Sequence, residues 1–362
     1  MGSTSASQSA TVKIVALEAQ FGPIPEFDDF NGKYEITIYD VTPRNDVKVL
    51  NERIGDADVA IITTMPMTAA TLAPEVTPNL RAIMVMAAGT DHIDLEYCRK
   101  RGIRVLNSPR ANTTTVAEHA VALYFAVRRC VVQTHVRTVQ DQWPKHRTLL
   151  SSLRDKDNRL PLGLKDEVAG IIGYGGVGKH IAKLCSALGM SVMIADRKAN
   201  STQKHHASPP ASTNGSEVTR ASFADVLAKC TAIFVAVPRL PTTLDMISAT
   251  ELATMNGRAV LINVSRGGIV NEADLVSALR CRQIAGAATD VFLTEPASTE
   301  NSVLLKALAE EDVKKDEEKL PLVVTPHTAW YSEVTMENLV EDVRTNVVGW
   351  SRGVLPPENL IV

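Results

Sequence analysis

Four residues in the second half of the chain have the types that acid–base chemistry on a carboxylate-bearing substrate requires: one arginine, two acids and one histidine. Arg266 follows the apolar stretch AVLINVS, Asp290 lies near the end of IAGAATDVF, and His327 ends LVVTPH. If these stretches are neighbouring parallel strands, their carboxyl ends bring the three residues to one edge of one sheet. Glu295 lies five residues after Asp290, on a predicted loop that can reach the histidine.

These residue types suit the transfer of one proton to an oxygen atom. An unperturbed histidine has a pKa of about 6.5, and a neighbouring carboxylate favours its protonated form, so such a side chain can pass a proton to a developing alkoxide. Arg266 can bind a carboxylate through two charge-assisted hydrogen bonds, and the glycines at 267 and 268 indicate a close backbone approach there. A single histidine or arginine after a strand is often structural. The four groups together favour a proton-transfer site.

A second pattern, VAGIIGYGGVGKHIAKLCSALGMSVMIADR, predicts a strand, a glycine turn, a helix, a second strand and an acid. Gly173, Gly175 and Gly178 have the GxGxxG spacing, which allows a tight turn, close approach of a pyrophosphate, and close packing of helix on strand. The helix N-terminus favours an anion, and Val177 is a candidate backbone donor. Asp196 follows the second strand, where it can accept hydrogen bonds from a ribose.

The identity of the cofactor depends on the residues around that acid. Asp196 favours NAD, because a carboxylate repels the 2′-phosphate of NADP. Arg197 and Lys198 follow it directly and could neutralise such a phosphate, so NADP stays open as the alternative.

The first hundred residues contain five apolar stretches separated by polar or helical connections: KIVALE, YEITIYD, DVAIITT, LRAIMVM and IRVLNSP. This alternation predicts a small parallel sheet with helices on its faces. Residues 86–94, MAAGTDHID, form a glycine turn directly after one of these strands, where open α/β sheets bind ligands. An ordinary strand-to-helix turn is the alternative.

A long helix is expected after three consecutive threonines that end at Thr115. Thr115 and Glu118 have the spacing of a capping box, and the apolar run continues to about Val132. Such a helix can connect two domains. Residues 143–164 are polar and basic with two prolines, which predicts a loop with short helical pieces.

The stretches EVAGIIGY, SVMIADR, TAIFVAVP, AVLINVS, IAGAATDVF and LVVTPH predict a second sheet of six parallel strands. Residues 199–220 are rich in Ser, Thr, Asn and Pro and are predicted to be a mobile surface insertion; His205 and His206 within it lack partners at metal-ligand spacing. The charged segment 309–319 is interpreted as a solvated helix end or loop. A last helix, over residues 332–352, is expected to pack back on the first domain.

Composition sets wide bounds on this chain of 362 residues. Its hydrophobic content of 45% and net charge of −3 are typical of a soluble protein of two domains, with no basic excess to suggest nucleic acid or a membrane surface as a partner. The polar N-terminus lacks the apolar core of a signal peptide, and the apolar segment 120–127 is too short to span a bilayer. Five scattered cysteines without CxxC spacing predict reduced thiols in a cytoplasmic protein and no metal site.

Taken together, the stretches GIIGYGGVGKHIA, NVSRGGIVNEADLVSAL, AGAATDVFLTEP and VVTPHTAW resemble the D-isomer-specific 2-hydroxyacid dehydrogenase family over nearly the whole chain. The resemblance implies an α/β protein in which a doubly wound Rossmann dinucleotide-binding domain is inserted in a smaller, flavodoxin-like substrate domain. The expected boundaries are 11–112 and 329–362 for the substrate domain and 113–328 for the Rossmann domain. It also implies a homodimer formed through the dinucleotide domain.

The resemblance assigns roles at the predicted catalytic edge. Arg266 resembles the arginine that binds the substrate's carboxylate and carbonyl oxygen, Glu295 the acid that orients the histidine, and His327 the general acid and base. Asp290 resembles the group that holds the nicotinamide carboxamide. Further positions that resemble cofactor contacts are Pro238, Thr242 and Val264.

Four further positions resemble substrate contacts. Backbone amides near Ala88 and Gly89 would hold the carboxylate, and Asn112 lies at the asparagine that touches substrate in formate dehydrogenases. Trp330 could stack on a substrate side chain, as the corepressor-like TPHTAWYSE stretch allows, or serve as hinge packing. Formate dehydrogenases carry glutamine at the position of Glu295, which tells against formate.

The expected function is therefore the reduction of a small 2-oxo acid to a D-2-hydroxy acid with NAD(P)H. The substrate would be of the glyoxylate or hydroxypyruvate type, or a bulkier 2-oxo acid. The alternative is a corepressor-like protein that senses NAD(H) with little or no turnover. The departures from the family pattern are NVSRG before the arginine, the insertion after Asp196, and a gap of 32 residues between Glu295 and His327.

Overall fold

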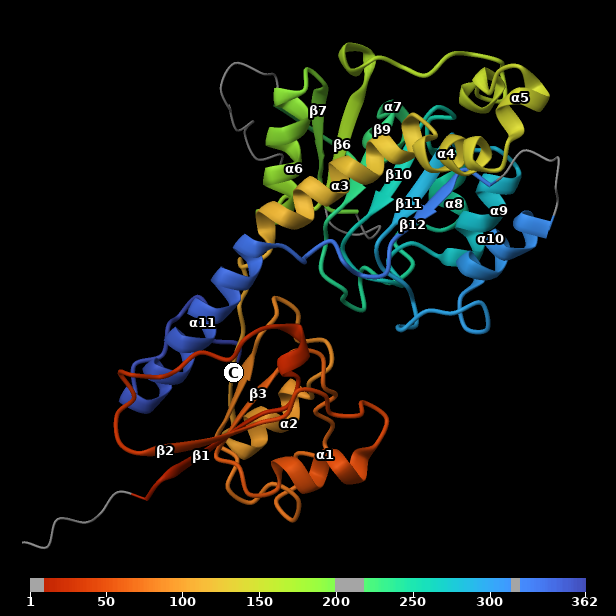
Figure 1. Cartoon of the computed structure of the whole chain (residues 1–362). Coiled ribbons are helices and arrows are strands. Elements are labelled where there is room, and N and C mark those ends of the chain that lie inside the picture. Colours follow the sequence, from red (N-terminus) through yellow and green to blue (C-terminus); the bar gives the residue numbers. More distant parts are fainter. Residues whose placement is uncertain (1–9, 199–217, 314–319) are drawn as a thin grey trace, which may run out of the picture. The chain divides into compact units, whose positions relative to one another are not determined.

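The computed structural model describes residues 10–198, 218–313 and 320–362 (Figure 1). The expectations for the N-terminal tail, for His205 and His206, and for most of the two insertions lie outside these residues. None of the helices in the described part of the chain combines the length and the hydropathy that crossing a lipid bilayer requires.

The chain divides into two compact units. The first, which we call the split unit, comprises Met1–Asn112 together with Tyr331–Val362. The second, which we call the continuous unit, comprises Thr113–Trp330.

The split unit is built on five parallel strands in the order β2-β1-β3-β4-β5. This is the flavodoxin-like order, and the five apolar stretches predicted each of its strands. Every residue of β3 and β4 is buried, as expected of parallel strands covered on both faces. The strand bounds are β1 (Val12–Ala16), β2 (Tyr34–Ile38), β3 (Val59–Ile62), β4 (Ala82–Val85) and β5 (Arg104–Leu106).

The helices of the split unit pack on this sheet. Asp94 begins α2 by accepting the backbone N–H of Tyr97, as an N-cap acid should. Helix α11 contacts β4, and its residues Leu339, Val343 and Val347 are buried. The helix bounds are η1 (Ala19–Phe21), α1 (Val47–Ile54), α2 (Leu95–Arg101) and α11 (Glu333–Arg352).

The continuous unit contains a parallel sheet of seven strands in the order β12-β11-β10-β9-β6-β7-β8. The three strands on each side of the β6–β9 boundary follow the doubly wound Rossmann order, and β12 extends it. The chain changes direction between β6 and β9, so the switch point lies beside the glycine turn. The bounds are β6 (Val168–Ile172), β7 (Ser191–Ala195), β8 (Val218–Ala221), β9 (Ala232–Val235), β10 (Val260–Asn263), β11 (Gly286–Thr289) and β12 (Leu322–Val324).

The seventh strand corrects the sequence prediction, which counted six and placed residues 199–220 in a mobile insertion. Residues 218–220 belong to β8, which pairs in parallel with β7 at the edge of the sheet. The strand was missed because its sequence, VTRA, is short and follows a polar run, so it carries no apolar pattern of its own.

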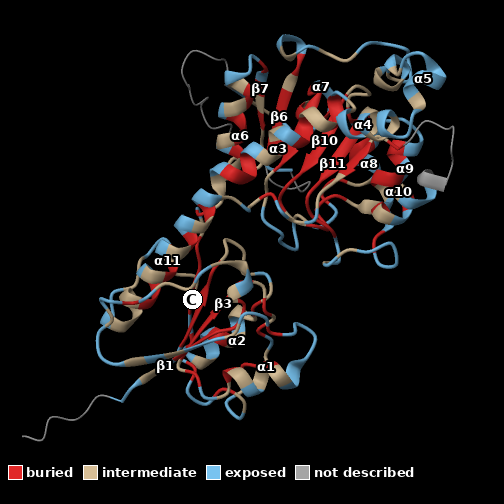
Figure 2. Cartoon of the chain, in the orientation of Figure 1, coloured by how far each residue is buried: buried red, intermediate tan, exposed pale blue. Residues whose placement is uncertain are grey.

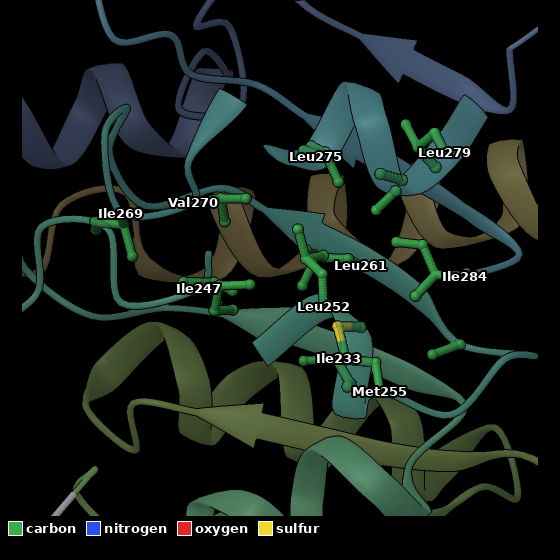
Figure 3. Close-up of a cluster of buried hydrophobic side chains, with 14 of the residues drawn as sticks. Ile233, Ile247, Leu252, Met255, Leu261, Ile269, Val270, Leu275, Leu279 and Ile284 are labelled. Atoms are coloured by element: carbon green, nitrogen blue, oxygen red, sulfur yellow. The ribbon is translucent and has the colours of Figure 1, made fainter. Parts of the chain in front are cut away.

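Helices cover both faces of the larger sheet, whose inner strands β9, β10 and β11 are buried throughout (Figure 2). One core lies between the sheet and helices α3 and α6. The other lies under α7 to α10, where Leu252 and Leu275 meet Ile233 and Leu261 of the strands (Figure 3). The bounds are α3 (Thr113–Arg128), α4 (Val131–Val139), α5 (Gln142–His146), η2 (Leu150–Leu153), η3 (Leu164–Asp166), α6 (Gly176–Ala187), α7 (Phe223–Lys229), α8 (Ala249–Thr254), α9 (Glu272–Arg280) and α10 (Val303–Val313).

Two local predictions around α3 need correction. The helix begins at Thr113, so Thr115 is a buried residue inside its first turn and cannot be the capping residue. It ends at Arg128, and the apolar run beyond it belongs to a separate helix, α4. The capping prediction was wrong because Ser/Thr–x–x–Glu spacing also occurs inside the first turn of a helix. There a threonine can be buried, as Thr115 is.

The five cysteines are free, and three of them are buried. Burial raises the pKa of the Cys98 thiol to about 11 and that of the Cys185 and Cys230 thiols to about 12. These three side chains therefore fill the cores as neutral thiols. Among the described residues, no group of three or more His, Cys, Asp or Glu side chains is arranged to hold a metal ion.

Candidate active site

The carboxyl ends of β10, β11 and β12 lie side by side at one edge of the larger sheet. Asn263 pairs with Thr289, and Thr289 pairs with Val324, so the three strands end in register. The pairing continues into the loops, because the N–H of Asp290 donates to the carbonyl of Asn263 (3.0 Å) and the N–H of His327 donates to the carbonyl of Asp290 (2.8 Å). Parallel pairing thus delivers Asp290 and His327 to the same edge.

Glu295 meets the histidine there. Its Oε2 lies 2.6 Å from Nδ1 of His327, and its Oε1 accepts the N–H of Phe292 at 2.9 Å. Burial alone would raise the pKa of Glu295, but the hydrogen bond and charge of His327, the Phe292 N–H and the charge of Arg266 outweigh burial and lower it. Glu295 is therefore held as a carboxylate against the imidazole ring.

Arg266 follows β10 at the same edge, and its own turn holds it in place. Its carbonyl accepts the side-chain amide of Asn263 at 3.0 Å, and its Nη1 donates to the carbonyl of Ser265 at 2.8 Å. A Cβ atom at Gly267 would lie only 1.8 Å from the carbonyl oxygen of Phe292. The close approach inferred from the glycines is thus made by the chain's own backbone, which carries Glu295 towards the edge.

Asp290 supports the loop that carries His327. Its carboxylate, in a residue that is 1% exposed, accepts the N–H groups of Thr328 (3.0 Å) and Ala329 (2.9 Å) and the hydroxyl of Thr325 (2.6 Å). The resemblance assigned Asp290 to the nicotinamide carboxamide. In the structure, its Oδ1 accepts from residues on both sides of His327 and its Oδ2 accepts from Ala329. Asp290 thus fixes the conformation of the loop that contains His327.

The backbone of His327 has a φ of +54°, in the left-handed region that residues with a side chain seldom adopt. The indole N–H of Trp330 donates to the carbonyl of His327 at 2.9 Å, and the ring packs against the core under α3. Strain of this kind persists only where surrounding contacts enforce it, and it gathers at functional sites. Trp330 therefore supports the histidine's backbone within the continuous unit.

The glycine turn after β6 has the three properties that a dinucleotide needs. At Gly173 (φ +97°) a Cβ atom would lie 2.4 Å from the carbonyl oxygen of Ala236, and at Gly178 it would lie 1.9 Å from that of Gly173. At Gly175, by contrast, a Cβ atom would meet nothing within 4 Å. The first and third glycines are thus required by the chain's own packing, whereas the second leaves open space at the start of α6, where Val177 lies in the first turn.

The other predicted cofactor positions also lie at the carboxyl edge. Asp196 directly follows β7, and its N–H donates to the carbonyl of Ala221 at 2.9 Å. Pro238 and Thr242 are exposed in the loop after β9. The side chain of Val264 is buried in the core, so this residue can offer a ligand only its backbone.

The remaining predicted substrate positions, Ala88, Gly89 and Asn112, belong to the split unit. Ala88 and Gly89 follow β4 at the carboxyl edge of that sheet, and both are half-buried. Asn112 is also half-buried and immediately precedes α3.

Asn107 holds the turn at Ala88 and Gly89, and the sequence analysis did not identify it. Its side-chain amide donates to the carbonyl of Ala88 at 2.7 Å, and its own carbonyl accepts the amide of Asn346 at 3.1 Å. Because a trans peptide directs its N–H opposite to its C=O, fixing the carbonyl of Ala88 also fixes the direction of the Gly89 N–H. One feature of the sequence could have indicated this role: Asn107 directly follows an apolar strand, at the carboxyl edge of the sheet, where ligands bind.

His119 is the second residue that was missed. It lies on α3, and its Nε2 is 3.0 Å from the hydroxyl of Thr325 and 3.7 Å from Oδ1 of Asp290. Nothing in the local sequence marks it, because the contact joins residues 206 positions apart.

Comparison with known proteins finds a matching family, similar sequences and similar structures. Residues 121–329 match the family described as D-isomer-specific 2-hydroxyacid dehydrogenase, NAD-binding domain. The chain is 33% identical to a glycerate dehydrogenase from Methylorubrum extorquens, over 92% of this chain and 94% of the relative, and 31% identical to a glyoxylate reductase from Thermococcus litoralis, over 91% and 90%. A D-lactate dehydrogenase from Aquifex aeolicus, solved with NAD and lactic acid, superposes with a TM-score of 0.72 at 23% identity and covers 97% of this chain and 99% of its own.

Proposed function

Because the chain belongs to the D-isomer-specific 2-hydroxyacid dehydrogenase family and is thus an NAD(P)-dependent oxidoreductase acting on CH–OH groups, we propose that it reduces a small 2-oxo acid to the D-2-hydroxy acid. The observation that carries the proposal is the 2.6 Å contact between Glu295 and His327 at the carboxyl edge of the dinucleotide-binding sheet. The relatives named glycerate dehydrogenase and glyoxylate reductase support substrates of the glyoxylate or hydroxypyruvate size.

His327 is the proton donor in this proposal. Glu295 engages Nδ1, so the proton on Nε2 is the one that the ring passes to the carbonyl oxygen of the substrate. The Glu295 carboxylate stabilises the positive charge that the ring carries before transfer. General acid catalysis of this kind contributes a factor of roughly 10² to 10⁴ in rate.

Arg266 binds the carboxylate and carbonyl oxygen of the substrate, and its guanidinium stabilises negative charge on that oxygen as it develops. The backbone amides at Ala88 and Gly89 hold the substrate carboxylate, and Asn112 contacts the substrate. Asn107 acts on the Gly89 amide as a positioning residue through the Ala88 carbonyl.

NAD(P)H, when bound, supplies the hydride for the carbonyl carbon. The open space at Gly175 and the N-terminus of α6 receive its pyrophosphate, with the N–H of Val177 as a donor, and Asp196 accepts hydrogen bonds from its ribose. Pro238, Thr242 and the backbone of Val264 lie along the cofactor. Asp290 holds the loop of His327 and is the candidate for the nicotinamide carboxamide.

The test is the oxidation of NADH by a panel of glyoxylate, hydroxypyruvate, pyruvate and bulkier 2-oxo acids, with chiral chromatography of the products. We expect turnover of at least one small member and a D product. The alternative function is an NAD(H)-sensing, corepressor-like binding protein, which has no chemical need for a proton donor paired with a carboxylate. Absence of turnover across the panel, together with a dimer that tightens when NADH is added, would replace the enzyme proposal by that alternative.

We also propose that the chain forms a homodimer through the continuous unit. The segment between α3 and β6 exposes six large apolar side chains, at 45% to 70% exposure: Val131, Val132, Val139, Trp143, Leu150 and Leu160. A segment that exposes this many large apolar side chains supports an interaction site there. Light scattering should give twice the chain mass for the wild type, a lower mass for Val139→Asp with Trp143→Asp, and no change for the control Val354→Asp, since Val354 is an exposed residue of the split unit.

A further inference from the structure

An arginine from outside the glycine motif lies against the acid that ends β7. Arg220 belongs to β8, which pairs in parallel with β7, and its Nη1 is 3.7 Å from Oδ1 of Asp196. Its guanidinium carbon lies 5.7 Å from the centre of the Tyr174 ring, and Tyr174 stands between the first two glycines of the phosphate turn. Arg220 therefore lies at the ribose end of the dinucleotide site.

Arg197 and Lys198, which the sequence suggested as partners of a 2′-phosphate, do not pair with Asp196 in the structure. The Nζ of Lys198 is 2.8 Å from Oε1 of Glu251 and donates to the carbonyl of Met246 at 2.9 Å, so it is bound to the neighbouring helix α8. Arg197 is exposed. Of these basic side chains, Arg220 is the one that the structure pairs with Asp196.

The geometry points to dual cofactor use, a proposal that rests on the proposed function and goes beyond it: Arg220 binds the 2′-phosphate of NADPH, so the site accepts NADPH as well as NADH. An acid at the end of the second strand suits a ribose hydroxyl, and a nearby arginine accommodates a phosphate there. The planar guanidinium offers two parallel N–H groups to phosphate oxygens. The side chains of Arg220 and Asp196 are 28% and 39% exposed, which leaves both accessible to a ligand.

The same pair explains how one site can accept both cofactors. When NADH binds, Asp196 accepts from the ribose and Arg220 balances its charge. When NADPH binds, Arg220 turns its donors to the phosphate and offsets the repulsion from Asp196. The pair lies at the surface, where ion pairs contribute little to stability, so removal of Arg220 should leave a folded protein.

The test measures binding without substrate, by titrating the fluorescence of NADPH and of NADH. We expect wild-type dissociation constants for the two cofactors that agree within about tenfold. Arg220→Ala should raise the dissociation constant for NADPH by about tenfold or more, as expected for the loss of a charge-assisted hydrogen bond, and that for NADH by less than about threefold. The NADPH dissociation constant of Arg220→Lys should lie between those of the wild type and Arg220→Ala, because lysine keeps the positive charge but lacks the two parallel N–H groups of a guanidinium.

Arg197→Ala is the matched control, since it removes a neighbouring arginine and should leave the NADPH to NADH ratio unchanged. Competition by 2′-AMP, and its loss in Arg220→Ala, locates the effect at the 2′-phosphate. The proposal is overturned if the wild-type dissociation constant for NADPH exceeds that for NADH by more than about tenfold. It is also overturned if Arg220→Ala leaves the ratio of the two constants unchanged, or if Arg197→Ala causes the larger loss of NADPH binding. Because these readouts need no 2-oxo acid, they stand apart from a failure of the proposed reaction.

Discussion

In the seven-stranded sheet, a carboxylate is paired with a cationic or protonatable side chain both at the amino ends and at the carboxyl ends of the strands. The two pairs differ in solvent exposure. At the amino end, Oε1 of Glu167 lies 2.6 Å from Nε of Arg128, and the two side chains are 0% and 7% exposed. At the carboxyl end, Glu295 and His327 are 30% and 40% exposed. The chemistry of the contact is similar, but only the second pair can meet a ligand.

The buried pair also forms hydrogen bonds with neighbouring groups. Glu167 accepts the hydroxyls of Tyr124 and Thr231, and Arg128 donates to the carbonyls of Thr231 and Arg258. These bonds tie α3 to the base of the sheet. A buried pair of this kind is closed to ligands, and the loss of one partner would leave the other charge buried and uncompensated. A pair at the solvent-exposed edge can take part in a reaction.

The largest effect should come from the exposed pair. Substitution of His327 by asparagine should lower kcat by about 10² to 10⁴-fold, because the proton donor is lost. The melting temperature should change by only about 2 °C or less, since the imidazole is partly exposed. Steady-state kinetics and thermal unfolding of the same preparation measure both. A kcat within about threefold of the wild type would remove the histidine from the mechanism.

The buried pair should behave in the opposite way. Arg128→Met leaves Glu167 buried without its cation, so the free energy of unfolding should fall by about 3 to 5 kcal/mol. The kcat of the remaining folded protein should equal that of the wild type. Urea unfolding and active-site titration with NADH check the two expectations. Equal unfolding midpoints for variant and wild type would mean that this pair does not stabilise the fold.

Glu295→Gln should have an intermediate effect on activity. It keeps the shape of the side chain and removes the charge that faces His327, so kcat/KM should fall by about 10-fold to 10²-fold, as expected for a hydrogen bond between charged groups. Turnover near the wild-type level would show that orientation alone is sufficient.

The same variant tests the pH dependence of stability. The pKa of Glu295 is lowered in the folded protein, so its pairing stabilises the fold above the unfolded-state pKa of about 4.3 and this contribution is lost as the pH falls through the lower folded-state pKa. The melting temperature of the wild type should therefore exceed that of Glu295→Gln near neutral pH, and the difference should shrink on acidification below the unfolded-state pKa. A difference that grows on acidification contradicts the sign of the shift.

The smallest effect is expected in the split unit. Asn107→Ala frees the Ala88 carbonyl and loosens the Gly89 amide, so KM for the 2-oxo acid should rise by about 2-fold to 10-fold, the value of one neutral hydrogen bond. Asn31→Ala removes a comparable side-chain bond, to the carbonyl of Ser351 at an exposed position, and should leave KM unchanged. Equal KM values for the two variants would exclude the positioning role.

The sequence predicted the larger features of the two units because these follow from short-range rules. Glycine spacing marks the turn at Gly173 and Gly178, where a Cβ atom would strike the backbone. The shared edge of Arg266, Asp290 and His327 follows from the parallel pairing of three apolar strands. The glycine spacing and each apolar stretch can be recognised in the linear sequence, and parallel strands of one sheet end at the same edge.

The features that were missed depend on contacts between distant segments. The four residues of β8 form a strand only because they pair with the edge of β7. The glycine after Arg266 indicated a close backbone approach, but its partner, the carbonyl of Phe292 on another loop, could not be identified from the sequence. The hydrogen bonds of Asn107 and Asp290 join side chains to loop backbone, whose conformation has no periodicity to detect. Side chains that position others are therefore harder to predict than the groups they position.

The central claim is that the exposed pair at the carboxyl edge performs the reduction. The most direct measurement is the reduction of hydroxypyruvate with NADH that carries two deuterium atoms at C4 of the nicotinamide, followed by mass spectrometry and chiral chromatography of the glycerate. The account predicts that the wild type forms D-glycerate with one deuterium at C2, and that His327→Asn forms it at least about one hundred times more slowly. Deuterated D-glycerate produced at the wild-type rate by His327→Asn would contradict it.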